Sequence, residues 1–309
     1  MNRARQRSHP ERDGSTNGST TGSKLAPWSL MFLAILWGST FFSIKRILAH
    51  LPVTDFLAVR FLISTVVLAL VFHRQFRMSR RTFLHGAVLG VLWAVAQLLQ
   101  TAGLARTSAS ISGFITGLYV VFTPVLGLVL FKLRVNRWVW VAVGLAAAGL
   151  AALTIRPQAG DVIGYGEVLT IACAVVYALH IAVLGHWSTP SQAASLTLAQ
   201  SLSMTVVFVA FALPGGIQLP ADAVDWAWML YFAVLCGAVA LLVQTWAQSH
   251  LEASKAAVIM CSEPLWATFF AILFGGERPT WLFALGAATI LLAMYLVIRP
   301  PAQKSDQTL

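Results

Sequence analysis

The sequence predicts an all-α membrane protein whose ten transmembrane helices form two inverted five-helix repeats. Three observations lead to this fold class: the composition, the spacing of the apolar runs and a repeat between the two halves. Of the 309 residues, 58% are hydrophobic and only 10% are charged, and the mean hydropathy is +0.76. Because a soluble domain carries about a quarter charged residues, this chain lacks the polar side chains that a soluble surface needs.

Composition also excludes several functional classes. The net charge of +10 comes from a tail and from short loops rather than from one amphipathic face, which argues against a nucleic-acid partner. The three cysteines, Cys173, Cys236 and Cys261, each lie inside an apolar run without metal-ligand spacing. We therefore expect no disulfide framework, no metal site and no cofactor.

The first element is a polar tail over residues 1–27. It is rich in Gly, Ser and Thr, and it is too long a lead for a signal peptide. Such a composition favours a disordered cytoplasmic tail. A second polar tail covers 299–309.

Ten apolar runs follow, each close to the length that crosses a bilayer. The fourth and ninth are interrupted by Pro124 and Pro264, and both stay helical candidates because membrane helices tolerate proline. The expected spans are 28–48, 54–73, 82–104, 110–131, 137–155, 164–185, 191–213, 225–247, 254–274 and 280–298.

The distribution of lysine and arginine predicts the orientation. With the amino terminus inside, fifteen of these residues fall on the inner side and three in outer loops. The positive-inside rule then places both termini in the cytoplasm. We expect a multi-pass protein of a bacterial inner membrane, in direct contact with the lipid bilayer.

The two halves resemble each other at offsets of 140 to 144 residues. Each half, 28–155 and 164–298, contains five spans, and an odd number forces the second half to enter the membrane from the opposite side. Inverted repeats of this kind are typical of secondary transporters. The clearest matches are Trp37-Gly38 with Tyr177-Ala178, Gln100-Thr101 with Gln244-Thr245, and Thr123-Pro124 with Glu263-Pro264.

Several short runs resemble the EamA domain, two copies of which make the ten-helix architecture of drug/metabolite transporters. The first half departs from that pattern at Lys132-Leu133-Arg134, where a Gly-Glu pair is common. The resemblance implies export of small metabolites, with amino acids and their analogues as the first class to test. The runs are 36–45 (LWGSTFFSIK), 59–61 (VRF), 107–110 (TSAS), Thr123-Pro124, Glu263-Pro264 and 275–278 (GGER).

Glu263 is the most informative single residue. It lies in the middle of a span beside Pro264, and a carboxylate at membrane depth is costly enough to indicate a functional site. It would suit proton exchange or the binding of an ammonium group. The alternative is a glutamate that only fixes helix packing, since its counterpart in the first half is Thr123.

Lys45 and Arg60 are candidates for gating or structural charges. Both lie toward the outer ends of their spans. Snorkelling to the interface is sufficient for Lys45. Arg60 is expected to pair with an inner polar group, with a gate or an anchor for a substrate carboxylate as the alternative.

Polar and aromatic side chains recur at helical spacing on several spans, which places them on one face of each helix. They could line a cavity for a small polar solute or, alternatively, form interhelical hydrogen bonds and packing contacts. Three aromatic residues in the middle of spans could stack on an aromatic or cationic substrate or could serve packing alone: Trp37, Tyr119 and Trp266. With Glu263 and members of the stripes, the candidate substrate-binding residues are Trp37, Trp93, Gln97, Gln100, Tyr119, Tyr177, His180, Gln244, Glu263 and Trp266.

The sequence thus predicts a secondary transporter that exports small metabolites by alternating access, with protons as a candidate coupling ion. A polyspecific drug exporter of the same fold is the first alternative. An intramembrane enzyme would need a constellation that His73, His85, His186 and His250 do not supply, because none has HExxH-type spacing. The third alternative is a scaffold or sensor that binds solutes without moving them across the membrane.

Overall fold

The computed structural model describes residues 17–107, 109–133, 135–154, 164–275 and 281–298, and within these ranges the regular structure is helical, without a strand. Eight helical segments are long and apolar enough to cross a membrane. Two shorter apolar helices, Lys24–Gly38 and Arg137–Ala152, coincide with the other two expected spans. The chain is therefore a multi-pass helical membrane protein, while the total of ten crossings and their orientation stay predictions.

The first half contains seven α-helices among the described residues. A 3₁₀ turn, η1 (His73–Arg77), connects the third and fourth of them. The helices are α1 (Asn17–Gly38), α2 (Thr40–Leu48), α3 (Val53–Val71), α4 (Arg80–Leu104), α5 (Ala109–Gly117), α6 (Tyr119–Phe131) and α7 (Arg137–Thr154).

The second half repeats this order of spans with two differences: its first span is one continuous helix, and its third span is divided by a π-helical turn, η4 (Val234–Val239). Two 3₁₀ turns, η2 (Pro190–Gln192) and η3 (Leu213–Gly215), flank α9. The helices are α8 (Tyr165–Trp187), α9 (Ala193–Ala212), α10 (Ala223–Ala233), α11 (Ala240–Gln248), α12 (Ala253–Met260), α13 (Glu263–Gly275) and α14 (Trp281–Ile298).

The chain becomes helical earlier than the sequence suggests. Helix α1 begins at Asn17, inside the segment 1–27 that we expected to be a tail, and it continues through Pro27. Residues 1–16 and 299–309, which hold the rest of both predicted tails, lie outside the described residues.

The breaks in the helices do not fall at the prolines. The fourth span breaks at Leu118 and the ninth at Cys261 and Ser262. Pro264 is the second residue of α13, where a helix needs no backbone N–H, whereas Pro124 lies inside α6. The prolines thus correctly indicate which spans are interrupted, but the interruptions lie a few residues before them.

The first span also breaks, at Ser39 between α1 and α2. The hydroxyl of Ser39 donates to the carbonyl of Leu36 at 2.7 Å, and that of Thr40 donates to the carbonyl of Trp37 at 2.7 Å. Such bonds offer the backbone an alternative to the helical ladder. The span expected at 28–48 is therefore two helices rather than one.

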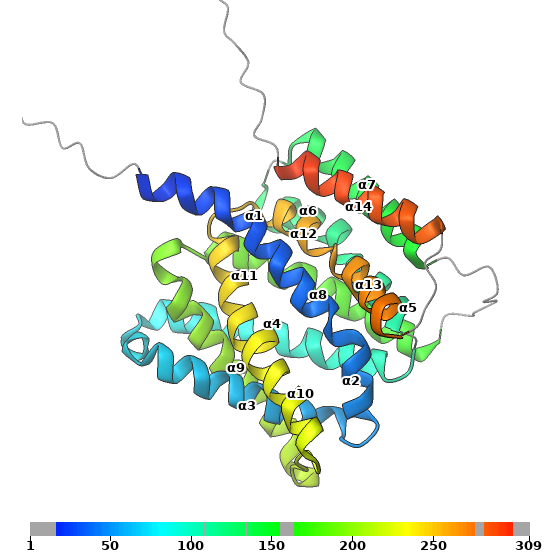
Figure 1. The fold of residues 1–309 in the computed structure, drawn as a ribbon. Coiled ribbons are helices and arrows are strands. Elements are labelled where there is room, and N and C mark those ends of the chain that lie inside the picture. Colours follow the sequence, from blue (N-terminus) through cyan, green and yellow to red (C-terminus); the bar gives the residue numbers. More distant parts are fainter. Residues whose placement is uncertain (1–16, 108, 134, 155–163, 276–280, 299–309) are drawn as a thin grey trace, which may run out of the picture.

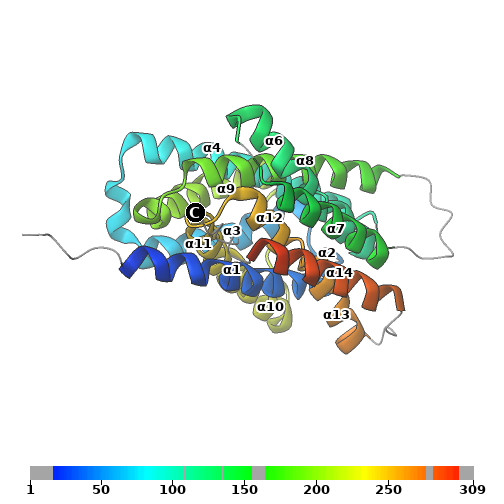
Figure 2. The same ribbon diagram turned by 90° about the horizontal axis from the view of Figure 1, so that it is seen from above.

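Related helices pack in related ways, as Figures 1 and 2 show. Helices α7 and α14 lie side by side at one edge of the bundle, and α3 packs against α9 away from that edge. Between them, α4 packs against α8, and α1 packs against α11. In each contact, the third span of one half packs against the first span of the other half. The packing therefore follows the 140-residue repeat.

A pair of hydrogen bonds joins the halves at equivalent positions. The hydroxyl of Thr65 donates to the carbonyl of Ser201 at 2.9 Å, and that of Thr205 donates to the carbonyl of Phe61 at 2.8 Å. Adding 140 to the numbers of Thr65 and Phe61 gives Thr205 and Ser201. The α3–α9 contact therefore lies where an axis relating the two halves would pass.

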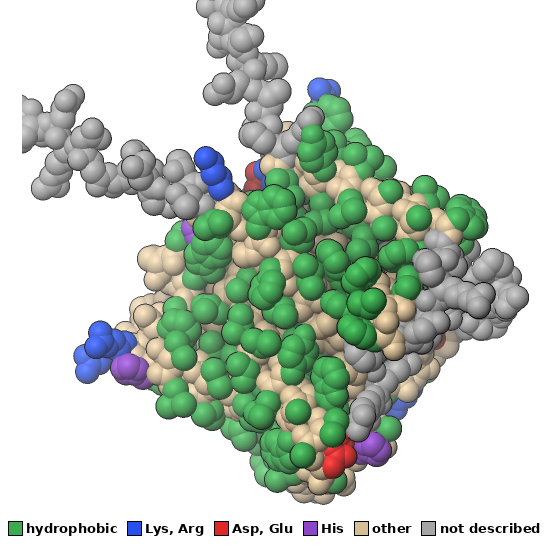
Figure 3. Space-filling view, in the orientation of Figure 1, with side chains coloured by type: hydrophobic (Ala, Val, Ile, Leu, Met, Phe, Trp, Pro, Cys, Tyr) green, Lys and Arg blue, Asp and Glu red, His purple; other side chains and the backbone are tan. Residues whose placement is uncertain are grey.

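The outer surface of the bundle is apolar between two charged ends. Hydrophobic side chains cover most of the face in Figure 3, and the charged ones gather toward its edges. On α3, for example, Leu62, Val66 and Leu70 recur every fourth residue and are exposed. This surface suits lipid contact, since nothing else covers it in the described part of the chain.

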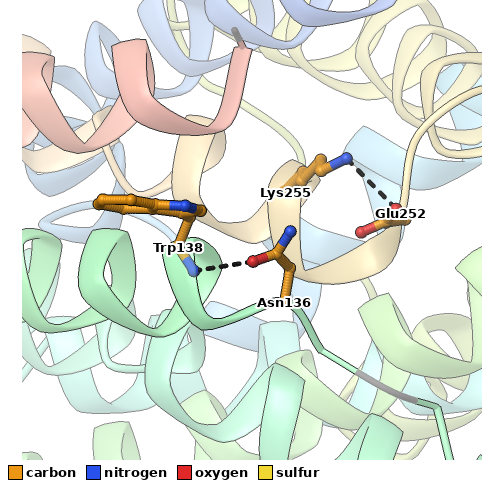
Figure 4. A network of polar contacts seen from close by, with 4 residues as sticks. All are labelled: Asn136, Trp138, Glu252 and Lys255. Atoms are coloured by element: carbon orange, nitrogen blue, oxygen red, sulfur yellow. Dashed lines mark hydrogen bonds and ion pairs between the residues drawn. The ribbon is translucent and has the colours of Figure 1, made fainter. Parts of the chain in front are cut away.

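The connections at one end are polar. The start of α1, the end of α14 and the α3–α4 connection lie at the same end of the bundle (Figures 1 and 2). In the predicted cytoplasmic loops, Asn136 Oδ1 accepts from the backbone N–H of Trp138 at 3.0 Å, and Lys255 Nζ donates to Glu252 Oε1 at 3.2 Å (Figure 4). These contacts begin α7 and α12.

Candidate functional site

A cavity lies inside the bundle. Helices of both halves contribute to its wall, and polar and aromatic side chains alternate around it. Its lining consists of Trp37, Thr40, Phe41, Ile44, Arg60, Trp93, Gln97, Gln100, Thr101, Leu104, Thr116, Tyr119, Tyr177, Ile181, Gln244, Met260 and Glu263.

The structure brings together eight of the ten residues that the sequence suggested for substrate binding. They line the cavity from α1, α4, α6, α8, α11 and α13. Two pairs, Trp37 with Tyr177 and Gln100 with Gln244, occupy equivalent positions in the two halves. The eight are Trp37, Trp93, Gln97, Gln100, Tyr119, Tyr177, Gln244 and Glu263.

The other two do not reach the cavity. His180 is fully buried behind it, where Nε2 bonds to Gln200 Oε1 at 3.0 Å and the ring meets the edge of Trp93. Trp266 packs against Phe269, with ring centroids 6.0 Å apart. Helical spacing groups His180 with Tyr177, and a mid-span position suggests Trp266; neither residue belongs to the cavity lining.

Arg60 lines the cavity, but its guanidinium donates to backbone carbonyl groups. Its Nε donates to the carbonyl of Phe232 at 3.2 Å and its Nη2 to that of Cys236 at 3.1 Å. The guanidinium also lies 5.1 Å from the ring centroid of Phe61. These contacts favour the structural interpretation of Arg60. The side chain of Lys45, the other candidate charge, lies outside the part of the structure that is described.

Aromatic rings form one continuous wall of the cavity. Trp37 and Trp93 meet edge to face with centroids 5.6 Å apart, and Trp93 and Tyr177 do the same at 5.7 Å. Trp37 is fixed in turn because its Nε1 donates to the carbonyl of Cys236 at 3.2 Å. Rings held by such contacts present a preformed surface to a flat or apolar ligand.

The amides of α4 are largely bonded to their neighbours. Tyr177 donates to Gln97 Oε1 at 3.0 Å, and Gln97 Nε2 donates to Thr101 at 3.2 Å. Gln100 Nε2 donates to Thr116 at 3.4 Å. The polar stripes therefore serve both interpretations: they line the cavity and they link α4 to α5 and α8.

Glu263 stands out because no partner accompanies it. It is the first residue of α13, lines the cavity and is 7% exposed. Among the described residues, no side chain or backbone group hydrogen-bonds or ion-pairs with its carboxylate. Three other lining atoms are buried without a partner: Trp93 Nε1, Tyr119 OH and Gln244 Oε1. Unpaired polar groups in a protein interior are costly, and they indicate a ligand or a proton.

Sequence reasoning missed part of the wall. Thr40, Phe41 and Ile44 lie three, four and seven residues after Trp37, so they continue its face onto α2. That spacing was available as a signal. Thr101 and Thr116 lie on polar stripes that the sequence already indicates for the third and fourth spans. Leu104, Ile181 and Met260 carry no signal that separates them from ordinary core residues.

The fold and the cavity define a class of protein. An apolar helical bundle whose two related halves enclose a polar and aromatic cavity is an arrangement found in membrane transporters. The chain belongs to the EamA-like transporter family, whose sequence model matches residues 25–155 and 164–299. Membership in this family points to a transporter rather than an enzyme.

Known relatives agree with this assignment. Two uncharacterized transporters of Archaeoglobus fulgidus are similar to this chain over 277 residues each. One is 29% identical, with 88% of this chain and 85% of the relative covered. The other is 25% identical, with 86% and 95% covered.

A crystal structure shares the fold. It superposes with a TM-score of 0.73 at 15% sequence identity, and the match covers 89% of this chain and 96% of that one. At this level of identity the likeness concerns the fold alone.

Proposed function

We propose that this protein is a secondary transporter that exports small amine-bearing metabolites, amino acids and their analogues, across a bacterial inner membrane by alternating access. The observation that carries the proposal is the carboxylate of Glu263, which lies without a partner in a cavity built by both halves of the chain.

A lone carboxylate can exchange one positive partner for another. A buried carboxylate is stable when it is either protonated or paired with a cation. If a proton and the ammonium group of a substrate compete for Glu263, only one of them is carried at a time. Inward movement of protons would then drive outward movement of the amine.

The position of the cavity supports alternating access. Equivalent residues of the two halves, such as Trp37 and Tyr177, face the same space. Two halves with related packing can interchange their conformations, which opens the cavity to one side and then to the other. A static binding protein has no need of this symmetry.

The aromatic wall favours a second candidate, a polyspecific drug exporter. Five aromatic side chains line the cavity: Trp37, Phe41, Trp93, Tyr119 and Tyr177. Such a wall accepts apolar molecules of varied shape. Glu263 is the one carboxylate among the described lining residues, so the cavity is aromatic-rich without being strongly acidic. The breadth of the substrate range separates the two candidates.

The test is efflux of a labelled amino-acid panel from proteoliposomes, with and without an imposed pH gradient. We expect the gradient to accelerate efflux by the wild type and to have no effect on Glu263→Gln. Glu252→Gln is the matched control, because Glu252 lies on an exposed turn and pairs with Lys255. Efflux by Glu263→Gln with unchanged rate and pH dependence would contradict the role of Glu263, and the absence of efflux for every amino acid and drug tested would contradict the proposal.

A further inference from the structure

We infer that the cavity selects monocationic amines with an aromatic body over the zwitterions and anions of the same size. This inference rests on the proposed function and narrows its substrate class from amino acids to those analogues that lack the α-carboxylate. It depends on which polar groups of the cavity are free and which are already bonded.

The free acceptors suit an ammonium group. The carboxylate of Glu263 has no partner among the described residues, and Gln244 Oε1 is buried without one. A primary ammonium carries three N–H donors and no acceptor. Its donors match both of these free acceptors, and it brings the positive charge that a buried carboxylate needs.

The aromatic wall suits the rest of such a ligand. Trp37, Trp93 and Tyr177 form a chain of edge-to-face contacts at the cavity surface. Their ring faces attract a cation electrostatically as well as packing against an apolar body. A cation with a ring attached uses both properties.

Among the described lining residues, a substrate carboxylate finds one cationic partner, and that side chain is already engaged. Arg60 is the one cationic side chain among the described lining residues, and two of its nitrogens already donate to the carbonyls of Phe232 and Cys236. The amides of Gln97 and Gln100 donate to neighbouring side chains.

Two neutral donors, Tyr119 OH and Trp93 Nε1, are unpartnered. They match a neutral acceptor such as a hydroxyl group, and they carry no charge to offset a carboxylate. An anionic group would also lie in the same cavity as Glu263, where like charges repel.

A matched ligand series tests the inference. Phenethylamine, phenylalanine and 3-phenylpropionate share one body and differ only in charged groups. We would measure their binding to the purified full-length protein in detergent by titration calorimetry at neutral pH. We expect phenethylamine to bind at least about tenfold more tightly than phenylalanine, since like-charge contacts cost several kcal/mol, and 3-phenylpropionate to bind most weakly.

Variants locate the cause of the preference. Glu263→Gln should lower the affinity for phenethylamine to the affinity for phenylalanine. The control Glu252→Gln should retain the full preference for phenethylamine. Gln244→Leu, which removes the second free acceptor, should also weaken phenethylamine binding, and it serves as the test if Glu263→Gln does not fold. Equal or tighter binding of phenylalanine, or a preference that survives both cavity variants, would overturn the inference.

The same ligands keep the two proposals apart. Proteoliposomes that export phenylalanine while binding shows no preference for phenethylamine would overturn the inference and leave the proposed function intact. A clear preference in binding without export of any ligand would support the inference and contradict the proposed function.

Discussion

Arg60 shows how a charged residue can be structural inside an apolar bundle. It is 4% exposed and lies beside the π-helical turn Val234–Val239. A π-turn shifts the hydrogen-bond register of its helix and leaves carbonyls that need other donors. Arg60 supplies two such bonds, and Ser64 supplies a third by donating to the carbonyl of Ala233 at 2.7 Å.

Replacing Arg60 by lysine should destabilise the protein. A lysine keeps the charge but cannot present two donors in the fixed geometry of a guanidinium. We expect Arg60→Lys to lose about 2 kcal/mol of stability, the typical contribution of hydrogen bonds to a charged group, measured as a lower Tm in detergent. Arg81→Lys, a change at an exposed position of the α3–α4 region, should leave the Tm unchanged. An unaltered Tm together with weaker binding of amino acids would instead make Arg60 an anchor for a substrate carboxylate.

Residue-level prediction from the sequence named about half of the residues that line the cavity. Rare polar groups in apolar spans are informative, because burying them is costly unless they bond or bind a ligand, and Glu263, Gln97 and Gln244 stand out for that reason. The sequence could not separate Tyr177 from His180, which lies three residues further along α8. Both belong to one helical stripe, and only the position of α9 and its Gln200 decides that His180 turns away from the cavity.

At the scale of the elements, the sequence predicted the spans better than their interruptions. Length and hydropathy identify apolar runs without further information. The break at Ser39 coincides with local bonds of Ser39 and Thr40, whereas the surroundings of the π-turn in the eighth span come from other helices. Trp37, for example, donates to the carbonyl of Cys236, 199 residues away. No local pattern can contain such a partner.

The close approach of α1 to α13 gives a prediction for this level. A Cβ added at Gly38 would lie 2.6 Å from the Cβ of Trp266 and 2.8 Å from the carbonyl oxygen of Glu263. Gly38→Ala must therefore push the two helices apart. We expect the free energy of unfolding to fall by about 1–3 kcal/mol, as for other overpacked sites. Amine binding should also weaken, because Glu263 would move with α13.

Gly144→Ala is the matched control for this change. Gly144 also lies within a helix, α7, but a Cβ there would meet nothing within 4 Å. The free energy of unfolding of Gly144→Ala should equal that of the wild type or exceed it by up to about 1 kcal/mol, the difference in helix propensity between glycine and alanine. Thermal unfolding in detergent and calorimetric binding measure both effects. If the two alanine variants behave alike, the α1–α13 contact does not position Glu263.

For the whole molecule, the decisive feature is that the cavity lies between halves that are related to each other. The offset of 140 residues was visible in the sequence because equivalent positions carry similar side chains. The sequence could not show which surfaces of the halves meet, because that depends on packing between distant helices. The structure adds the α7–α14 pair and the paired bonds of Thr65 and Thr205, which join equivalent elements directly.

Alternating access makes a prediction that a receptor or scaffold with the same cavity does not share. Thr116 lines the cavity and is 3% exposed, while Ser112, one turn earlier on α5, is fully buried and is not among the lining residues. The native cysteines Cys173, Cys236 and Cys261 are buried, so the wild type gives a low background with membrane-impermeant thiol reagents. We expect Thr116→Cys to react when the reagent is added to either face of the membrane, in right-side-out and in inverted vesicles, and phenethylamine to slow both reactions. Ser112→Cys should react from neither face.

The vesicles should also retain entrapped sulfate throughout, since a cavity that opens to one side at a time forms no continuous pore. Reaction of Thr116→Cys from a single face would contradict alternating access and favour a sensor, and loss of the entrapped sulfate would favour a channel.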